Sequence, residues 1–61
     1  MNEYIVQIID KDGKYFEIAI RATDYTFAVQ AVLRQHDTSC RAVGVCYVTD
    51  STHHVVVAKY K

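Results

Sequence analysis

The residues of this chain best suited to chemistry are three histidines and two cysteines: His36, Cys40, Cys46, His53 and His54. Imidazole and thiolate groups are preferred zinc ligands, and a structural zinc site needs about four of them. Their spacing contains no C-x-x-C pair or other compact ligand motif. Adjacent side chains on a strand, such as His53 and His54, point to opposite faces. We therefore interpret these histidines as turn and strand residues and expect no metal or other cofactor, while a metal site built from some of the five stays an open alternative.

Two arrangements could support nucleophilic catalysis. Asp50, Ser51 and His53 have the residue types of a triad, but all three belong to one turn. A nucleophile, its base and the group that orients the base must converge from different elements. The second arrangement pairs a cysteine with a histidine, and a sheet with one helix offers no obvious pocket for it. The sequence favours a protein that is not an enzyme.

The two cysteines are better interpreted as reduced thiols than as a disulfide. Cys40 and Cys46 are six positions apart in a segment rich in β-branched residues. On one extended strand this spacing separates them by roughly 20 Å. A disulfide requires Cα atoms within about 7 Å of each other.

Composition and charge narrow the class of protein. The chain has 61 residues, 51% of them hydrophobic, which indicates one small globular domain over residues 1–61. Seven Lys and Arg residues balance seven Asp and Glu residues, whereas most dedicated nucleic-acid-binding domains are basic. No apolar stretch approaches the roughly 18 residues of a membrane-spanning helix, and the N-terminus lacks the features of a signal peptide. We expect a cytoplasmic protein with no membrane partner.

The N-terminal segment EYIVQIIDKDGKYFEIAIRA predicts a β-hairpin. The loop Lys11–Gly13 suits a three-residue turn in which glycine supplies the left-handed position, and this turn pairs Asp10 with Lys14. Apolar residues then face each other along the hairpin, in the pairs Ile8–Phe16, Val6–Ile18 and Tyr4–Ile20. A continuous apolar face of this kind fixes the register. The opposite face is mixed and carries Ile5, Gln7, Ile9, Tyr15, Glu17 and Ala19.

The next segment, ATDYTFAVQAVLRQHDTS, changes to a helical period. Thr23 can cap a helix whose first turn contains Asp24, a position that the helix dipole favours. Apolar residues at helical spacing form one stripe: Tyr25, Ala28, Val29, Val32 and Leu33. Arg34 lies away from that stripe. We expect about three turns of helix covering one face of a sheet.

The C-terminal segment, CRAVGVCYVTDSTHHVVVAKYK, predicts a second hairpin interrupted at TDST. On its first strand, one alternating set is rich in small residues, which allow a helix to approach closely. We place this set toward the helix: Ala42, Gly44, Cys46 and Val48. The other set then faces away: Val43, Val45 and Tyr47. The last strand has no cleanly polar face, and which of its faces is buried stays open.

Together these elements predict an α+β fold of the form ββαββ. A right-handed crossover helix between the second and third strands is compatible with a four-stranded antiparallel sheet of order 2-1-3-4. One helix covers only one face of such a sheet, and an uncovered apolar face usually indicates a partner or a second copy of the chain. We expect this uncovered face and its rim to bind the partner, through Ile5, Ile9, Tyr15, Arg34, Tyr47, Lys11 and His53.

The chain resembles small phage and prophage proteins built as strand–strand–helix–strand–strand. The stretch Ala22–Ala28 resembles their A-S/T-x-x-x-A helix opening, with one additional residue here. Tyr4-Ile5-Val6 and Ala58-Lys59-Tyr60-Lys61 resemble the first and last strands of small anti-CRISPR proteins that block type I surveillance complexes. The resemblance covers most of the chain and implies a phage-encoded inhibitor that acts by steric blockade in the bacterial host cytoplasm. Those proteins use basic residues to occupy a nucleic-acid path, whereas this chain has a formal net charge of zero.

Three functions are compatible with these features. The first is a non-enzymatic protein–protein interaction module that docks on a host protein or ribonucleoprotein complex. The second is a small nucleic-acid-binding domain that uses tyrosines on the sheet face for stacking, although the basic and aromatic consensus of RNA-binding modules is absent. The third is a homodimer formed through the uncovered sheet face, which is compatible with either of the others.

Overall fold

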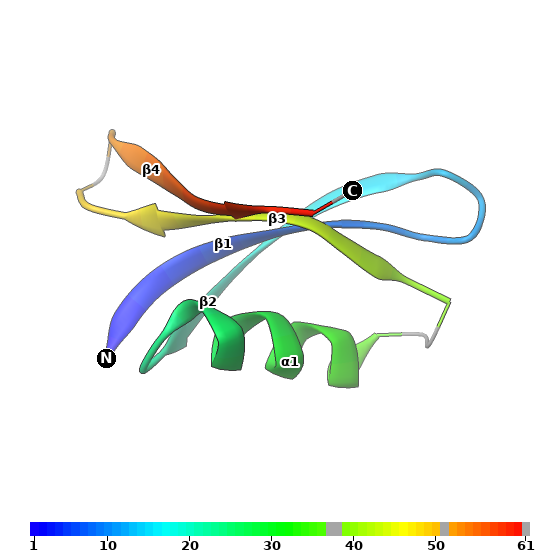
Figure 1. Ribbon diagram of the computed structural model, residues 1–61, viewed down its shortest axis with the longest axis horizontal. Helices are drawn as coiled ribbons and strands as arrows, with labels where there is room; N and C mark the ends of the chain where they lie inside the picture. Colours follow the sequence, from blue (N-terminus) through cyan, green and yellow to red (C-terminus); the bar gives the residue numbers. More distant parts are fainter. Residues whose placement is uncertain (37–38, 51, 61) are drawn as a thin grey trace.

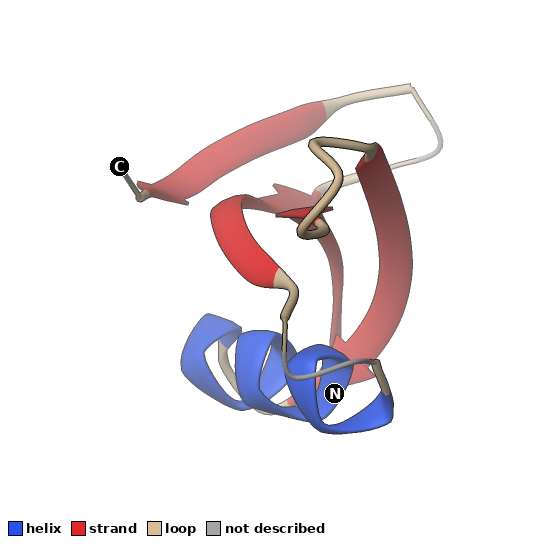
Figure 2. Cartoon of the chain, turned by 90° about the vertical axis from the view of Figure 1, so that its right-hand side faces the viewer, coloured by secondary structure: helices blue, strands red, loops and turns tan. Residues whose placement is uncertain are grey.

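The computed structural model describes residues 1–36, 39–50 and 52–60 of the chain (Figure 1). Its elements are β1 (Asn2–Ile9), β2 (Tyr15–Ala22), α1 (Tyr25–Gln35), β3 (Arg41–Val48) and β4 (His54–Lys59). The strands form one antiparallel sheet of order β2-β1-β3-β4, which confirms the predicted ββαββ fold. Figure 2 shows α1 on one side of the sheet. Within the described ranges, no helix has the length and apolar character needed to cross a membrane.

The β1–β2 hairpin has the register that its sequence predicts. The paired residues include Ile8 with Phe16, Val6 with Ile18 and Tyr4 with Ile20. In the turn, the Asp10 N–H donates a hydrogen bond to the Lys14 carbonyl at 3.0 Å, and Gly13 has a left-handed φ of 83°. The Asp10 carboxylate accepts the backbone N–H groups of Asp12 and Lys14, each at 2.9 Å. One aspartate and one glycine therefore fix the turn, and the turn fixes the face of every residue in β1 and β2.

The N-cap of α1 is Asp24, not the predicted Thr23. The Asp24 carboxylate accepts the Phe27 N–H at 3.1 Å and the Thr26 hydroxyl. These two hydrogen bonds, with that of Thr26 the larger, lower the pKa of Asp24. Aspartate is at least as good a cap as threonine, so the residue directly before the first helical turn takes the role.

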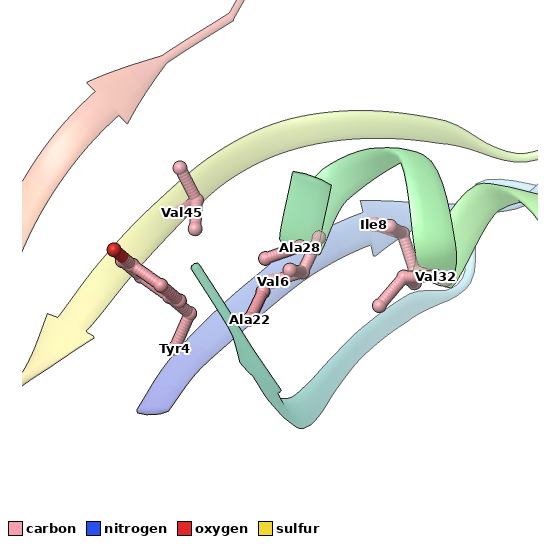
Figure 3. Close-up of a cluster of buried hydrophobic side chains, with 7 residues drawn as sticks. All are labelled: Tyr4, Val6, Ile8, Ala22, Ala28, Val32 and Val45. Atoms are coloured by element: carbon pink, nitrogen blue, oxygen red, sulfur yellow. The ribbon is translucent and has the colours of Figure 1, made fainter. Parts of the chain in front are cut away.

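The core lies between α1 and the face of the sheet that the helix covers (Figure 3). Its buried residues are Tyr4, Val6, Ile8, Ala22, Ala28, Val32 and Val45. Val29 and Leu33 of the predicted helix stripe pack against this cluster, whereas Tyr25 at the start of the stripe is 37% exposed. The helix lies against β1, β2 and β3. The edge strand β4 is therefore held mainly by its pairing with β3.

The predicted orientation of β3 is wrong. Tyr47 pairs with Tyr4, and Val45 pairs with Val6, so both side chains point to the side that α1 covers. The rings of Tyr4 and Tyr47 lie 5.6 Å apart between centroids. Residues of the other set, placed inward by the prediction, face away from the helix: Gly44, Cys46 and Val48. Burying valine and tyrosine removes more apolar surface from water than burying glycine and cysteine, which explains the choice.

Two β-bulges also break the simple alternation of faces. The register shift against β1 leaves Val43 as an extra residue of β3, and the shift against β4 leaves Val57 as an extra residue of β4. An extra residue reverses the facing of the residues beyond it. Ala42 and Ala58 therefore pack against the core, on the same side as α1.

Candidate binding face

The face of the sheet opposite α1 is the candidate site, and we call it the open face. On the open face, the cross-strand pairs of neighbouring strands form rows that run across the sheet from β2 to β4. One row, the apolar row, consists of Ala19, Ile5, Cys46 and Val56. The next, the polar row, consists of Glu17, Gln7, Gly44 and Lys59. The apolar row thus lies beside the polar row, which has opposite charges at its two ends.

A hydrogen-bond network orders the β1–β2 part of the open face. The Tyr15 hydroxyl donates to the Glu17 carboxylate at 2.9 Å, and the Gln7 amide donates to the same carboxylate oxygen at 3.4 Å. The Gln7 side chain also lies over Gly44, where a Cβ atom would collide with its oxygen. The pKa of Tyr15 is raised, first because surrounding atoms partly desolvate the hydroxyl and second because it donates to Glu17. The network holds the Tyr15 ring in one orientation on the face.

Exposure is uneven across the open face. Cys46, in the middle of the apolar row, is only 8% exposed, and Ile5 and Ile9 are half-buried. The exposed apolar area lies on the edge strands, where Val56 is 53% exposed and Tyr15 is 49% exposed. A binding partner would therefore contact Tyr15 and Val56 first, on opposite edges of the sheet.

The structure places only three of the seven predicted binding residues on this face: Ile5, Ile9 and Tyr15. The prediction that Tyr47 belongs to it is wrong, because Tyr47 packs beside Tyr4 on the covered side. The turns that contain Lys11 and His53 lie at opposite ends of the molecule, whose long axis measures 32 Å (Figure 1). Lys11 therefore lies at the same end of the molecule as Tyr15, the first residue of β2, whereas His53 lies at the other end.

Arg34 lies on α1, away from the open face. It lines a shallow pocket of about 330 Å³ between the helix and the end of β2, together with Arg21 and Phe27. It also borders a second, more open pocket near His36. The prediction that joined Arg34 to the sheet-face residues is not supported by this placement.

Sequence reasoning placed the β1 and β2 residues of both rows on this face and missed the residues that β3 and β4 contribute. Gln7 and Glu17 were visible as a cross-strand pair once the hairpin register was assigned, and this pairing was a usable signal for the network. Cys46 was missed because β3 was turned the wrong way, and Val56 was missed because the facing of β4 was left open. Lys59 was missed because the bulge at Val57 changes its face.

Asp50 and His53 stabilise the turn between β3 and β4 through the contacts of the Asp50 carboxylate. The Asp50 carboxylate accepts the N–H groups of Thr52 at 2.8 Å and His53 at 2.9 Å, and lies 3.0 Å from His53 Nδ1. The Thr52 N–H, followed by the His53 ring, lowers the pKa of Asp50. These contacts are typical of an aspartate in a turn. Ser51, the third member of the hypothetical triad, lies outside the described residues.

The metal-ligating residue types do not cluster in the described part of the chain, where no three His, Cys, Asp or Glu side chains could hold one ion. Cys40 and Cys46 are both free thiols. Cys40 packs against the core, whereas Cys46 lies on the open face. His36 is the C-cap residue of α1, and His54 pairs with Val48 at the start of β4.

Comparison with known proteins assigns no family to this chain. No protein-family model, no curated protein and no solved structure matches it. Its function must therefore be argued from the open face itself.

Proposed function

We propose that this chain is a non-enzymatic protein–protein interaction module that binds its partner through the open face. The apolar row is the observation that carries this proposal, because it crosses all four strands on the side that α1 leaves uncovered. Contiguous apolar surface beside polar residues is typical of protein-binding sites. The half-exposed Val56 on β4 and Tyr15 on β2 supply apolar and aromatic contact on the two edge strands of the open face.

Tyr15 is the principal anchor in this proposal. Tyrosine is enriched among the residues that dominate binding energies, since it offers a large apolar ring and a hydroxyl. Its hydrogen bond to Glu17 orients the ring before the partner arrives, which reduces the entropy lost on binding. Ile9 pairs with Tyr15 across the strands and lies beside it as a half-buried apolar neighbour.

The resemblance to small anti-CRISPR proteins motivates a narrower form of the proposal. In that form the chain is a phage-encoded inhibitor that binds a bacterial defence complex in the host cytoplasm and blocks it sterically. A net charge of zero favours a protein surface over a nucleic-acid path as the target.

A nucleic-acid-binding domain is the second candidate. The open face carries Arg21, Arg41 and Lys59 against Glu3 and Glu17, so its cations outnumber its acids by one. The exposed Tyr15 ring could stack on a base. Titration with labelled single- and double-stranded oligonucleotides at two salt concentrations tests it, since binding through phosphates weakens steeply with salt.

Adjacent valines provide a matched test of the leading proposal. Val55 and Val56 have nearly equal exposure, 52% and 53%, but Val56 lies on the open face and Val55 on the other. We expect affinity capture from bacterial lysate, read by mass spectrometry, to recover a partner with the native chain and with Val55→Glu, and to lose it with Val56→Glu. Equal recovery, or equal loss, with the two variants would contradict binding through the open face.

A further inference from the structure

We propose that the open face also binds a second copy of this chain, as a two-fold symmetric dimer in which the two sheets stack face to face. The inference rests on the proposed role of the open face as a binding surface and names an occupant for it. It starts from the polar row, which ends in Glu17 on β2 and in Lys59 on β4. Neither of these residues has an ion-pair partner within the described part of the chain.

The charge pattern selects one geometry for the dimer. Two identical stacked sheets are related by a two-fold axis that lies in the plane between them. With the axis along the strands, between β1 and β3, β2 of each copy faces β4 of the other, and Glu17 faces Lys59 twice. With the axis along the polar row, Glu17 would face Glu17 and Lys59 would face Lys59. Facing like charges are unfavourable, so the axis runs along the strands.

The apolar rows of the two copies are also complementary to each other under the same two-fold rotation. Ala19, the smallest side chain of the row, faces Val56, which is 53% exposed. Ile5 faces Cys46 at the centre, next to the axis. A small residue opposite a protruding one allows the two faces to interdigitate at the usual distance of about 10 Å between packed sheets.

The available area indicates a modest affinity. The molecule measures 32 by 18 Å across its two longest axes, a projected face of about 580 Å². A standard stable interface buries about 800 Å² per partner. We expect a concentration-dependent dimer that a partner protein displaces, so that self-association and partner binding exclude each other.

Charge reversal tests this geometry by sedimentation velocity of the full chain over a range of concentrations. Glu17→Lys alone and Lys59→Glu alone should each weaken self-association about tenfold, because two attractive contacts become repulsive. Asp12→Lys, a charge reversal in the exposed β1–β2 turn outside the rows, should leave it unchanged.

Mixing the two single variants gives the decisive measurement. A dimer of one Glu17→Lys chain with one Lys59→Glu chain has both contacts attractive again, so the mixture should associate more strongly than either variant alone. A native chain that stays monomeric, or a mixture no stronger than its components, would overturn the proposal. A monomeric chain that still captures a lysate partner in a Val56-dependent way would refute the dimer and leave the proposed function intact. A dimer without such capture would refute the proposed function alone.

Discussion

The two faces of this sheet are built from the same strands, yet they are stabilised in different ways. On the covered face, Val6, Ile8 and Val45 have no exposed surface and pack against α1. On the open face, side-chain hydrogen bonds from Tyr15 and Gln7 to Glu17 replace helix packing. Apolar residues occur on both faces, so hydrophobicity alone does not decide which of them the helix covers.

The covered face accounts for most of the stability of the domain, whereas recognition is the role that we propose for the open face. Complete burial of aliphatic side chains supplies most of the free energy of folding in a domain this small. The open-face network contributes less, because its groups are exposed and exchange hydrogen bonds with water. What the network does provide is a fixed orientation for an exposed aromatic ring, and pre-ordering of this kind favours binding.

The largest expected effect comes from adjacent isoleucines on opposite faces. Ile8→Ala should lower the free energy of unfolding by about 2–5 kcal/mol, because it leaves a cavity in the fully buried core. Ile9→Ala, on the open face, should cost about 1 kcal/mol, since Ile9 is already partly in contact with water. Urea denaturation followed by circular dichroism measures both. If Ile8→Ala unfolds the domain outright, Ile8→Val should still cost about 0.5–1.5 kcal/mol. Equal losses at positions 8 and 9 would contradict the contrast between the faces.

The covered face was predictable from the sequence where a turn fixed the register. Gly13 suits the left-handed position of a three-residue turn, and that turn sets the pairing of β1 with β2 residue by residue. The helix stripe was equally readable, because Ala28 and Val32 recur at helical spacing. Local sequence determines both features, so no knowledge of distant contacts was needed.

The open face was less predictable because β3 and β4 alternate between two apolar sets. Within β3, the larger apolar area of Val45 and Tyr47 favours burial of that set, whereas the small residues of the other set favour close approach of a helix, so the two signals oppose each other. The choice depends on pairing with β1, where Val6 and Tyr4 already point toward the helix. The bulges at Val43 and Val57 then change the facing of the residues beyond them, and no residue type in the sequence marks a bulge there.

A second, smaller effect tests how α1 is attached to the covered face. Asp24→Ala should lower the melting temperature by about 5 °C, because the Phe27 N–H loses its acceptor. Thr23→Ala should leave the melting temperature unchanged, since Thr23 lies outside the helix. Thermal denaturation monitored at a helix-sensitive wavelength measures both. The opposite ranking would identify Thr23 as the cap.

The Asp24 cap also predicts a dependence on pH. Its pKa is lower in the folded chain than in the unfolded one, so the ionised carboxylate stabilises the fold above the unfolded pKa of about 3.9. This contribution is lost as the pH falls through the lowered folded pKa. The difference in stability between the native chain and Asp24→Ala should therefore shrink in acid. A difference that stays constant across that range would show that the carboxylate charge has no role in the cap.

The smallest effect tests the contact between Gln7 and Gly44 on the open face. Gly44→Ala should destabilise the native chain by about 0.5–1 kcal/mol, because the new Cβ displaces the Gln7 side chain from its place beside Glu17. In a Gln7→Ala background the same change should be neutral or stabilising, since alanine restricts the unfolded chain more than glycine does. Urea denaturation of the four chains of this double-mutant cycle measures the coupling.

Gly13 supplies the matched control for that cycle. Gly13→Ala should destabilise the chain equally with and without Gln7, because its cost arises from the left-handed φ of 83° and the added Cβ meets no atom within 4 Å beyond its neighbours in the chain. Additive effects of Gly44→Ala and Gln7→Ala would mean that Gln7 does not lie over Gly44 in solution. In that case Gln7 would not be held beside Glu17, and the order ascribed to this part of the open face would rest on the Tyr15–Glu17 hydrogen bond alone.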